Sequence, residues 1–239
     1  MYHLKNKPSK NHGAFENQTC KRGLLRRRIK MKVNLLNVTP NAEEHIVEVA
    51  RISSSRKNKK DKPEGLLAYL VRHKHWSPFE HGHATFEIET SKAIGIQLIR
   101  HRSFSFQEFS QRYQDVNRLE SMFEPIELRA QCEDNRQSST EVIDPKIEFM
   151  DLKDVNSSDA INAYLNYGHD LYNQLLEAGV ARETARMILP LATTTKIHMT
   201  GSIRSWIHFL ELRDDEHAQK EIQMIAKEIK QHFKEQFPI

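Results

Sequence analysis

The sequence predicts an α+β fold in which helices outnumber strands. Several segments carry apolar residues at helical spacing, and fewer, shorter segments alternate between apolar and polar residues as strands do. A helix-rich pattern with a few strands is typical of α+β proteins. The chain has 239 residues, 38% of them hydrophobic and 28% charged, which indicates a soluble globular protein of one large domain or two small ones.

The predicted elements begin near Met31. Residues 31–40, with the sequence MKVNLLNVTP, alternate like a first or edge strand. A helix is expected over residues 41–53, where Asn41 is a possible N-cap and apolar residues recur at helical spacing. The strand is expected to end at Pro40, and the apolar positions of the helix are Ile46, Val47 and Ala50.

A charged loop over residues 53–65 separates this helix from a short apolar helix at 66–75. Residues 83–90, with the sequence HATFEIET, alternate and therefore predict a strand. A further helix is expected from Ser91, as its cap, to about residue 101. The strand places Phe86 and Ile88 on one face and Glu87 and Glu89 on the other, and the helix places Ile94, Leu98 and Ile99 on one face.

The second half of the chain is predicted to be mostly helical. Residues 114–158 have the least regular pattern, since they are rich in acids, Asn and Ser. Amphipathic helices are expected over residues 159–179, 181–189, 202–212 and 215–233. Gly179 and Pro190 are expected to end the first two of these. The apolar positions are Ile161, Tyr164, Leu165, Leu171 and Leu175 in the first helix, Ile203, Trp206, Ile207 and Leu210 in the third, and Ile222, Ile225, Ile229 and Phe233 in the fourth.

The positive charge of the chain is concentrated in its first 30 residues, which contain nine Lys or Arg residues and one acid, Glu16. The net charge of this segment is +8, so a chain total of +4 leaves −4 for residues 31–239 and does not favour a nucleic-acid-binding body. Residues 1–30 are polar and lack an apolar run, so we expect a disordered basic extension before a folded domain at 31–239. A translation start at Met31 and an organelle-targeting role for the extension are alternatives.

Two further features bear on the compartment of the protein. No run of residues approaches the roughly 20 apolar residues of a membrane span. The cysteines, Cys20 and Cys132, have no CxxC partner, which argues against a disulfide framework or a cysteine zinc site and fits a reducing cytoplasm. The sequence also lacks a glycine-rich phosphate loop, so any nucleotide must be bound by side chains.

The stretch RHRSFSFQEFSQRY, residues 100–113, has the most distinctive chemistry. Basic residues at a helix end are common on a solvated surface, because the helix dipole favours each of them there by about 0.3–1 kcal/mol. The polar groups that follow also suit an anion site, since arginine binds phosphates and stacks on flat rings. The aromatic residues between them would suit single-stranded RNA, but the acidic body favours a small anion over a long polyanion.

Three other clusters carry polar side chains that suit a site. HKHWSPFEHGH, residues 73–83, invites a metal-binding interpretation through its histidines, although only Glu80 adds a carboxylate. In ARETARMILPL, Arg186 precedes Pro190, and a surface position is the simpler interpretation of this arginine. The stretch at 200–219 has two Arg–His pairs at i and i+4 beside several acids, like the wall of a polar site: Arg204 with His208, and Arg213 with His217.

These clusters, in this order, resemble the flavin-dependent thymidylate synthases. That family carries the signature R-H-R-x7-S-x-R, which here reads Arg100-His101-Arg102, then seven residues, then Ser110-Gln111-Arg112. The resemblance extends to SPFEH, ARMILPL and RSWIHFLELRDDEHAQKEI, and it covers most of residues 31–235 with a poor match at 125–158.

The resemblance implies a helix-rich α+β single domain with a small, mostly antiparallel sheet, which works as a homotetramer with sites built by more than one subunit. It implies a methyltransferase reaction that converts dUMP to dTMP, with 5,10-methylenetetrahydrofolate as carbon donor, NADPH as reductant through bound FAD, and tetrahydrofolate as product. This reaction needs no nucleophile from the protein, and Ser110 has no evident local base that would make it one. We expect a cytoplasmic enzyme without a metal, nucleic-acid or membrane partner.

The resemblance also implies the site residues, carried over by matching position. Arg213 is expected beside N3 of the uracil, where it stabilises the ionised pyrimidine as the catalytic residue. Arg112 and Arg186 are expected at the phosphate of dUMP. The remaining dUMP contacts are Gln97, Leu98, Ile99, Arg100, Glu108, Phe109, Ser110 and Gln111. The FAD contacts are Ser77, Arg100, His101, Arg102, Glu108, Ser202, Ile203, Arg204 and His208, and the residues expected near the flavin or folate are His75, Glu80 and His217. Ser202 and His208 stand where the family often has Asn.

Overall fold

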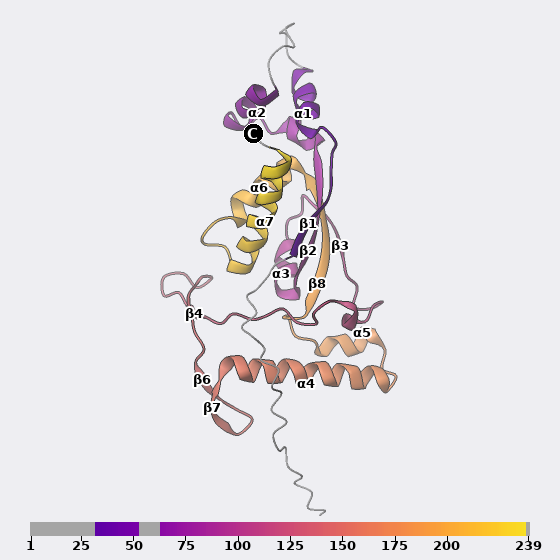
Figure 1. Cartoon of the computed structure of the whole chain (residues 1–239), viewed down its shortest axis with the longest axis vertical. Coiled ribbons are helices and arrows are strands. Elements are labelled where there is room, and N and C mark those ends of the chain that lie inside the picture. The colour runs from indigo at the N-terminus through magenta and orange to yellow at the C-terminus, as the bar shows by residue number, and fades with distance from the viewer. Residues whose placement is uncertain (1–31, 53–62, 238–239) are drawn as a thin grey trace, which may run out of the picture.

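The computed structural model describes residues 32–52 and 63–237. The predicted extension at 1–30 and most of the predicted loop at 53–65 lie outside these described residues. In the described part, helices pack around a four-stranded sheet, and two small hairpins extend from it near one end (Figure 1). The prediction of an α+β fold with a small antiparallel sheet is confirmed.

The central sheet has the strand order β1-β2-β8-β3, and every neighbouring pair is antiparallel. The strands are β1 (Lys32–Val38), β2 (His83–Ser91), β8 (Thr194–Ser202) and β3 (Ser105–Glu108). The strands predicted at 31–40 and 83–90 are confirmed, and β1 lies at an edge as expected. The pattern analysis does not predict β3 or the central strand β8, because threonines, a lysine and a glycine mask the alternation of Ile197 and Met199 in β8.

The two faces of the sheet differ in chemistry. Phe86 and Ile88 of β2 are fully buried, as predicted, and they join Ile197 and Met199 of β8 in the main core. The opposite face carries a ladder of charges, in which Lys196 pairs with Glu89 at 2.9 Å and with Glu87 at 3.4 Å. His198 contacts Glu87 at 3.1 Å.

Helices α6 (Ile203–Arg213) and α7 (Lys220–Gln236) cover the apolar face of the sheet (Figure 1). Trp206 is fully buried, packs edge-on against Phe86 at a centroid distance of 4.9 Å, and donates a hydrogen bond to the Ala84 carbonyl at 3.1 Å. In α6, Ile207 and Leu210 are only partly buried, whereas Phe209, which the pattern analysis omits, is fully buried. The predicted core positions of α7 are confirmed for Ile222, Ile225 and Ile229.

Helices α1 (Ala42–Arg51) and α2 (Pro63–Arg72) lie with the short η1 (Ser77–His81) at one end of the sheet (Figure 1). The predicted burial of Ile46 and Val47 in α1 is confirmed. Asn41 occupies the N-cap position, but its φ of 50° is left-handed and its side chain makes no capping hydrogen bond. Helix α2 begins earlier than the expected residue 66.

Helix α3 (Lys92–Leu98) is shorter than predicted. Ser91 caps it as expected, because its hydroxyl accepts a hydrogen bond from the Ile94 amide at 3.4 Å. Ile94 and Leu98 are buried, but Ile99 is 43% exposed, so its predicted place on the buried face is wrong. Since the helix ends at Leu98, residues Arg100–Arg102 lie in the turn that follows it. The interpretation of these residues as basic side chains at the end of a helix therefore does not apply to them as stated.

A second, smaller core lies around α4 (Ser157–Glu177), α5 (Arg182–Ala185), η2 (Val116–Arg118) and η3 (Arg186–Ile188). Its fully buried centre is Tyr172, which the pattern analysis does not single out, whereas the predicted apolar position Tyr164 is 51% exposed. Gly179 has a φ of 84° and follows α4, which confirms its predicted role at the helix end. The helix expected at 181–189 is instead one α-helical turn that continues as a 3₁₀ turn.

The segment predicted as irregular, 114–158, forms two hairpins beside η2. The first pairs β4 (Arg129–Gln131) with β5 (Ser139–Val142), and the second pairs β6 (Lys146–Phe149) with β7 (Leu152–Asn156). These strands are short and mostly exposed, so their sequences carry little of the alternation that reveals a half-buried strand. Among the helices of the described residues, none combines the length and the apolar character that a membrane span requires.

Candidate active site

The segment with the R-H-R-x7-S-x-R pattern leaves α3, turns, and enters the edge strand β3. Arg100 and Arg102 are exposed, and neither side chain makes a hydrogen bond or ion pair with another residue in 32–52 or 63–237. Phe104, between them and β3, is buried against Trp206 at a centroid distance of 4.6 Å. The buried ring of Phe104 therefore holds the turn against the core. The turn presents the guanidinium groups of Arg100 and Arg102, whose donors are available to an anion.

His101 links this turn to the last residue of α6. The Nε of Arg213 donates a hydrogen bond to Nε2 of His101 at 2.9 Å, and the imidazole packs edge-on against Phe209 at a centroid distance of 4.9 Å. Burial, followed by the charges of Arg213 and His208, lowers the pKa of His101 from 6.5 to about 4. A neutral imidazole with its proton on Nδ1 therefore holds Arg213 in place.

A second cluster joins η1 to the start of α6. Ser202 caps α6 by accepting from the Ser205 amide at 3.2 Å, and its hydroxyl donates to Glu80 at 2.6 Å. Arg204 donates to the other oxygen of the same carboxylate at 2.7 Å. The hydrogen bond from Ser202, and then that from Arg204, hold the pKa of Glu80 below its ordinary value although burial opposes them. The fold brings Glu80 together with Ser202 and Arg204, which lie 122 and 124 positions further along the chain.

Glu108 is held at the other end of β8 by residues that sequence reasoning misses. Its Oε1 accepts hydrogen bonds from Lys92 at 2.7 Å and from Thr195 at 2.8 Å. A Cβ at Gly95 would lie 3.6 Å from the same oxygen and tighter still against Ile197, at 3.1 Å. A lysine directly after a helix cap gives no pattern that marks it as a partner, so Lys92 is identified only by the fold.

Arg112 and Arg186, the two arginines expected at a phosphate, lie around one residue of α5. Arg112 reaches the Glu183 carboxylate at 3.4 Å, and Arg186 donates to the Glu183 carbonyl at 3.3 Å. Beside them Gln111 is 6% exposed, and its Nε2 has no hydrogen-bond partner among the described residues. A buried amide without a partner is costly, which favours a polar group from outside the described chain as its partner.

The other predicted residues are placed as follows. Gln97 donates a hydrogen bond to Gln219 at 2.6 Å, and His75 lies edge-on to Tyr69 at a centroid distance of 5.9 Å. His208 lies 3.8 Å from Glu211. His217 contacts Asp215 at 2.8 Å. Ser77 begins η1, Ile203 begins α6, Leu98 ends α3, and Phe109 and Ser110 follow β3.

Three of the four histidines of the metal-binding hypothesis, His73, His75 and His81, pack against other rings. His73 stacks on Tyr69 at a centroid distance of 4.0 Å, and His81 lies edge-on to His45 at 6.4 Å. Within residues 32–52 and 63–237, no group of three or more His, Cys, Asp or Glu side chains is arranged to hold a metal ion.

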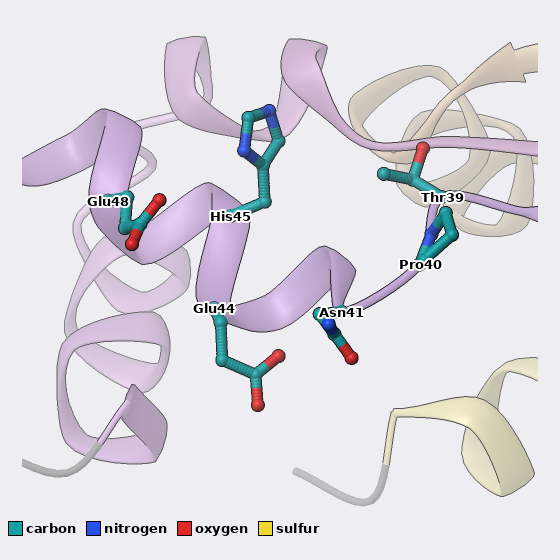
Figure 2. Close-up of a pocket in the computed structure, with 6 residues that line it drawn as sticks. All are labelled: Thr39, Pro40, Asn41, Glu44, His45 and Glu48. Carbon is teal, nitrogen blue, oxygen red and sulfur yellow. The ribbon is translucent and has the colours of Figure 1, made fainter.

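Two pockets of the described chain lie away from these clusters. One, of about 340 Å³, is lined by residues at the start of α1: Thr39, Pro40, Asn41, Glu44, His45 and Glu48 (Figure 2). The other, of about 330 Å³, lies between the β4–β5 hairpin and the start of α7. Neither is lined by a residue predicted for the site.

The fold and these clusters define an α+β protein that presents arginine, histidine and serine donors from its sheet ends instead of a glycine-rich loop. Residues 34–239 match the family model Thy1, described as thymidylate synthase complementing protein. The chain is 41% identical over 216 residues, 87% of its length, to a probable flavin-dependent thymidylate synthase of Paramecium bursaria Chlorella virus 1, of which it covers 96%. It is also 41% identical over 193 residues, 81% of its length, to the flavin-dependent thymidylate synthase of a Synechocystis strain, of which it covers 85%. The chain belongs to the Thy1 family.

Proposed function

We propose that this chain is a flavin-dependent thymidylate synthase that converts dUMP to dTMP. The carbon comes from 5,10-methylenetetrahydrofolate, and NADPH supplies the reducing equivalents through FAD. The observation that carries this proposal is the family match over residues 34–239, within which the R-H-R-x7-S-x-R residues are complete. The relatives in the Chlorella virus and in Synechocystis are both named for this activity.

The side chains of the proposed FAD site fit a dinucleotide chemically. FAD carries a diphosphate and a flat ring system, and exposed Arg100 and Arg102 offer donors that no described residue occupies. Arg204 and Ser202 add further donors around Glu80. We assign FAD binding to Ser77, Arg100, His101, Arg102, Glu108, Ser202, Ile203, Arg204 and His208, with His75, Glu80 and His217 near the flavin or folate. Bound FAD would supply the redox chemistry that carries reducing equivalents to the transferred carbon.

The protein's own contribution to dUMP chemistry is electrostatic. C5 of uracil is a poor nucleophile, and its electron density rises when negative charge on the ring is stabilised. We assign this role to Arg213 beside N3, with its guanidinium oriented by neutral His101 at 2.9 Å. Arg112 and Arg186 bind the phosphate, and Gln97, Leu98, Ile99, Arg100, Glu108, Phe109, Ser110 and Gln111 complete the dUMP site.

No protein nucleophile enters the proposed mechanism. Ser110 makes no side-chain hydrogen bond to a base within the described part of the chain, and a serine nucleophile requires one. Cys132 is half-buried in the β4–β5 hairpin, where it follows directly after β4. Both observations support transfer without a covalent enzyme intermediate.

We propose a homotetramer in the cytoplasm as the working form. Arg213 donates to His101, whereas Arg112 and Arg186 both contact Glu183, and no hydrogen bond or ion pair between described residues joins the first arginine to the other two. Exposed apolar side chains on α4 and beside η3 are available for contact between copies, among them Tyr164, Tyr167, Met187 and Leu191. These observations support sites that are completed by a second subunit.

The proposed activity is tested on purified protein by two measurements. The protein is expected to show the visible absorbance of oxidised flavin, which changes on addition of dUMP. It is also expected to release tritium from 5-labelled dUMP only when methylenetetrahydrofolate and NADPH are both present. A colourless protein that FAD does not reconstitute would contradict the proposal, as would tritium release that is independent of folate.

A further inference from the structure

A line of hydrogen bonds connects Gln97, a proposed dUMP contact, to a partly buried ion pair. Nε2 of Gln97 donates to Oε1 of Gln219 at 2.6 Å. Nε2 of Gln219 donates to Oε2 of Glu221 at 2.8 Å. The other oxygen of Glu221 accepts from Arg129 at 2.6 Å. The line therefore runs from the end of α3, through the start of α7, to strand β4 of the first hairpin.

The far end of this line is rigidly anchored. The side chains of Arg129 and Glu221 are 10% and 14% exposed. The other two nitrogens of the Arg129 guanidinium each donate one hydrogen bond, Nη1 to Glu127 at 3.0 Å and Nε to the Ser139 hydroxyl at 2.9 Å. Because a planar guanidinium with three fixed partners has little freedom to turn, Glu221 is held in one orientation.

The anchor sets the direction of every hydrogen bond in the line. An ionised carboxylate accepts hydrogen bonds and does not donate, so Gln219 must turn its NH₂ group towards Glu221. The carbonyl oxygen of Gln219 then faces Gln97, so Gln97 must donate to that oxygen from its own NH₂ group. The carbonyl oxygen of Gln97 is left as an acceptor, with no partner in the described part of the chain.

We propose that Gln219, Glu221 and Arg129 are positioning residues that orient the Gln97 amide, so that its carbonyl oxygen accepts a hydrogen bond from a donor of dUMP. The donor is the sugar hydroxyl, because the only ring N–H of dUMP is at N3, the position assigned to Arg213. This inference rests on the proposed function. An amide fixed in advance loses less freedom on binding, and it discriminates against ligands that lack the donor.

The test measures the dissociation constant of dUMP for the FAD-loaded, full-length protein by calorimetry. Gln219→Leu is expected to weaken dUMP binding by about 2- to 10-fold, the equivalent of one hydrogen bond. It should raise KM for dUMP while the kcat at saturating dUMP stays near that of the unmodified protein. The matched control is Gln231→Leu, which removes a glutamine from the same helix, 3.0 Å from Glu235 and outside the line, and should leave both values unchanged.

A double-mutant cycle distinguishes positioning from a general structural effect. Gln97→Leu is expected to weaken binding, and Gln97→Leu combined with Gln219→Leu should be no weaker than Gln97→Leu alone, because Gln219 acts only through Gln97. Losses that multiply would overturn the inference, as would a Gln219→Leu protein that binds dUMP as tightly as the unmodified one. Failure of the unmodified, FAD-loaded protein to bind dUMP would instead contradict the proposed function.

The identity of the donor is resolved with a second nucleotide. If the sugar hydroxyl is the donor, Gln219→Leu should have no effect on the binding of 2′,3′-dideoxyuridine monophosphate. If Gln219→Leu weakened the binding of the dideoxy nucleotide as much as that of dUMP, the sugar hydroxyl would not be the donor and the inference would be contradicted. Stronger binding of both nucleotides by Gln219→Leu would contradict it as well.

Discussion

His101 shows how the burial of one residue determines the charge of a site. A histidine whose pKa is lowered on folding contributes stability above its unfolded value of about 6.5, and this contribution is lost as the pH falls through about 4. Across the neutral range the ring is uncharged, so it accepts from Arg213 without adding positive charge beside it. The positive charge that we propose to stabilise the ionised pyrimidine is therefore carried by Arg213 and not by His101.

The protonation of His101 is directly measurable. In a nitrogen-detected NMR titration, its ring should remain neutral, with the proton on Nδ1, until the pH approaches about 4. Arg213→Ala should raise this pKa, but not to 6.5, because burial is the larger cause. The His101→Gln variant identifies the resonance. A pKa near 6.5 in the unmodified protein would contradict the burial described for this ring.

Arg213→Ala tests the electrostatic role proposed for this arginine. Oxyanion-type stabilising groups contribute about 10²- to 10³-fold to kcat, so turnover should fall by at least that range while much of the FAD is retained. Cys132→Ala is the control, and its activity should stay near that of the unmodified protein because no thiolate is invoked. Retained turnover in Arg213→Ala would reject the assignment beside N3.

At the scale of elements, strand β8 supports most of the candidate site. It pairs with β2 and β3, its Thr195 binds Glu108, and its last residue Ser202 binds Glu80. Sequence patterns predict β2 clearly but not β8, because polar β-branched residues on a central strand do not alternate as apolar and polar residues do. A strand whose apolar residues alternate with charged ones was therefore predictable, whereas β8, in which threonines also occupy buried positions, was not.

Gly201 tests the packing of β8 against the turn that carries Arg100–Arg102. A Cβ at this position would lie 2.4 Å from the ring of Phe104, which is buried and has little room to move. Gly201→Ala is therefore expected to lower the free energy of unfolding by about 1–3 kcal/mol. Gly65→Ala, in α2 with no atom within 4 Å, should be neutral or slightly stabilising. Equal stability of the two variants in chemical denaturation would contradict this packing.

At the scale of the whole molecule, the dUMP residues of one chain fall into two clusters. Gln97 and Arg213 belong to contacts around α3, α6 and α7, whereas Arg112 and Arg186 lie around α5. In a symmetric homo-oligomer, each cluster of one subunit can face the other cluster of its neighbour. We therefore predict that each dUMP site combines the two clusters from different subunits.

Subunit mixing tests this arrangement. Arg213→Ala and Arg186→Ala should each be inactive as homo-oligomers, because every site then lacks one arginine. Mixed oligomers, obtained by co-expression, should regain activity, since some sites receive both intact clusters. The control is a chain that carries both substitutions, Arg213→Ala and Arg186→Ala, and is expressed without a partner variant. If light scattering shows that the mixed forms are tetramers and they remain inactive, both arginines of a site come from one subunit.

The basic extension is predicted to be dispensable for the reaction. Residues 1–30 carry a net charge of +8, and the family match begins at residue 34. A chain that starts at Met31 should retain FAD and turn over dUMP at a rate near that of the full chain. Loss of bound FAD in this variant would show that the extension contributes to the folded domain.

The sequence by itself determined the fold class, the apolar faces of α1, α6 and α7, and the R-H-R-x7-S-x-R spacing, because these depend on residues close together in the chain. Only the tertiary structure decided which polar side chains meet. Arg213 and His101 are 112 positions apart, and Ser202 and Glu80 are 122 apart. Such pairs depend on how α6 packs against β8 and η1, and hydrogen bonds of this range leave no periodic trace in the sequence.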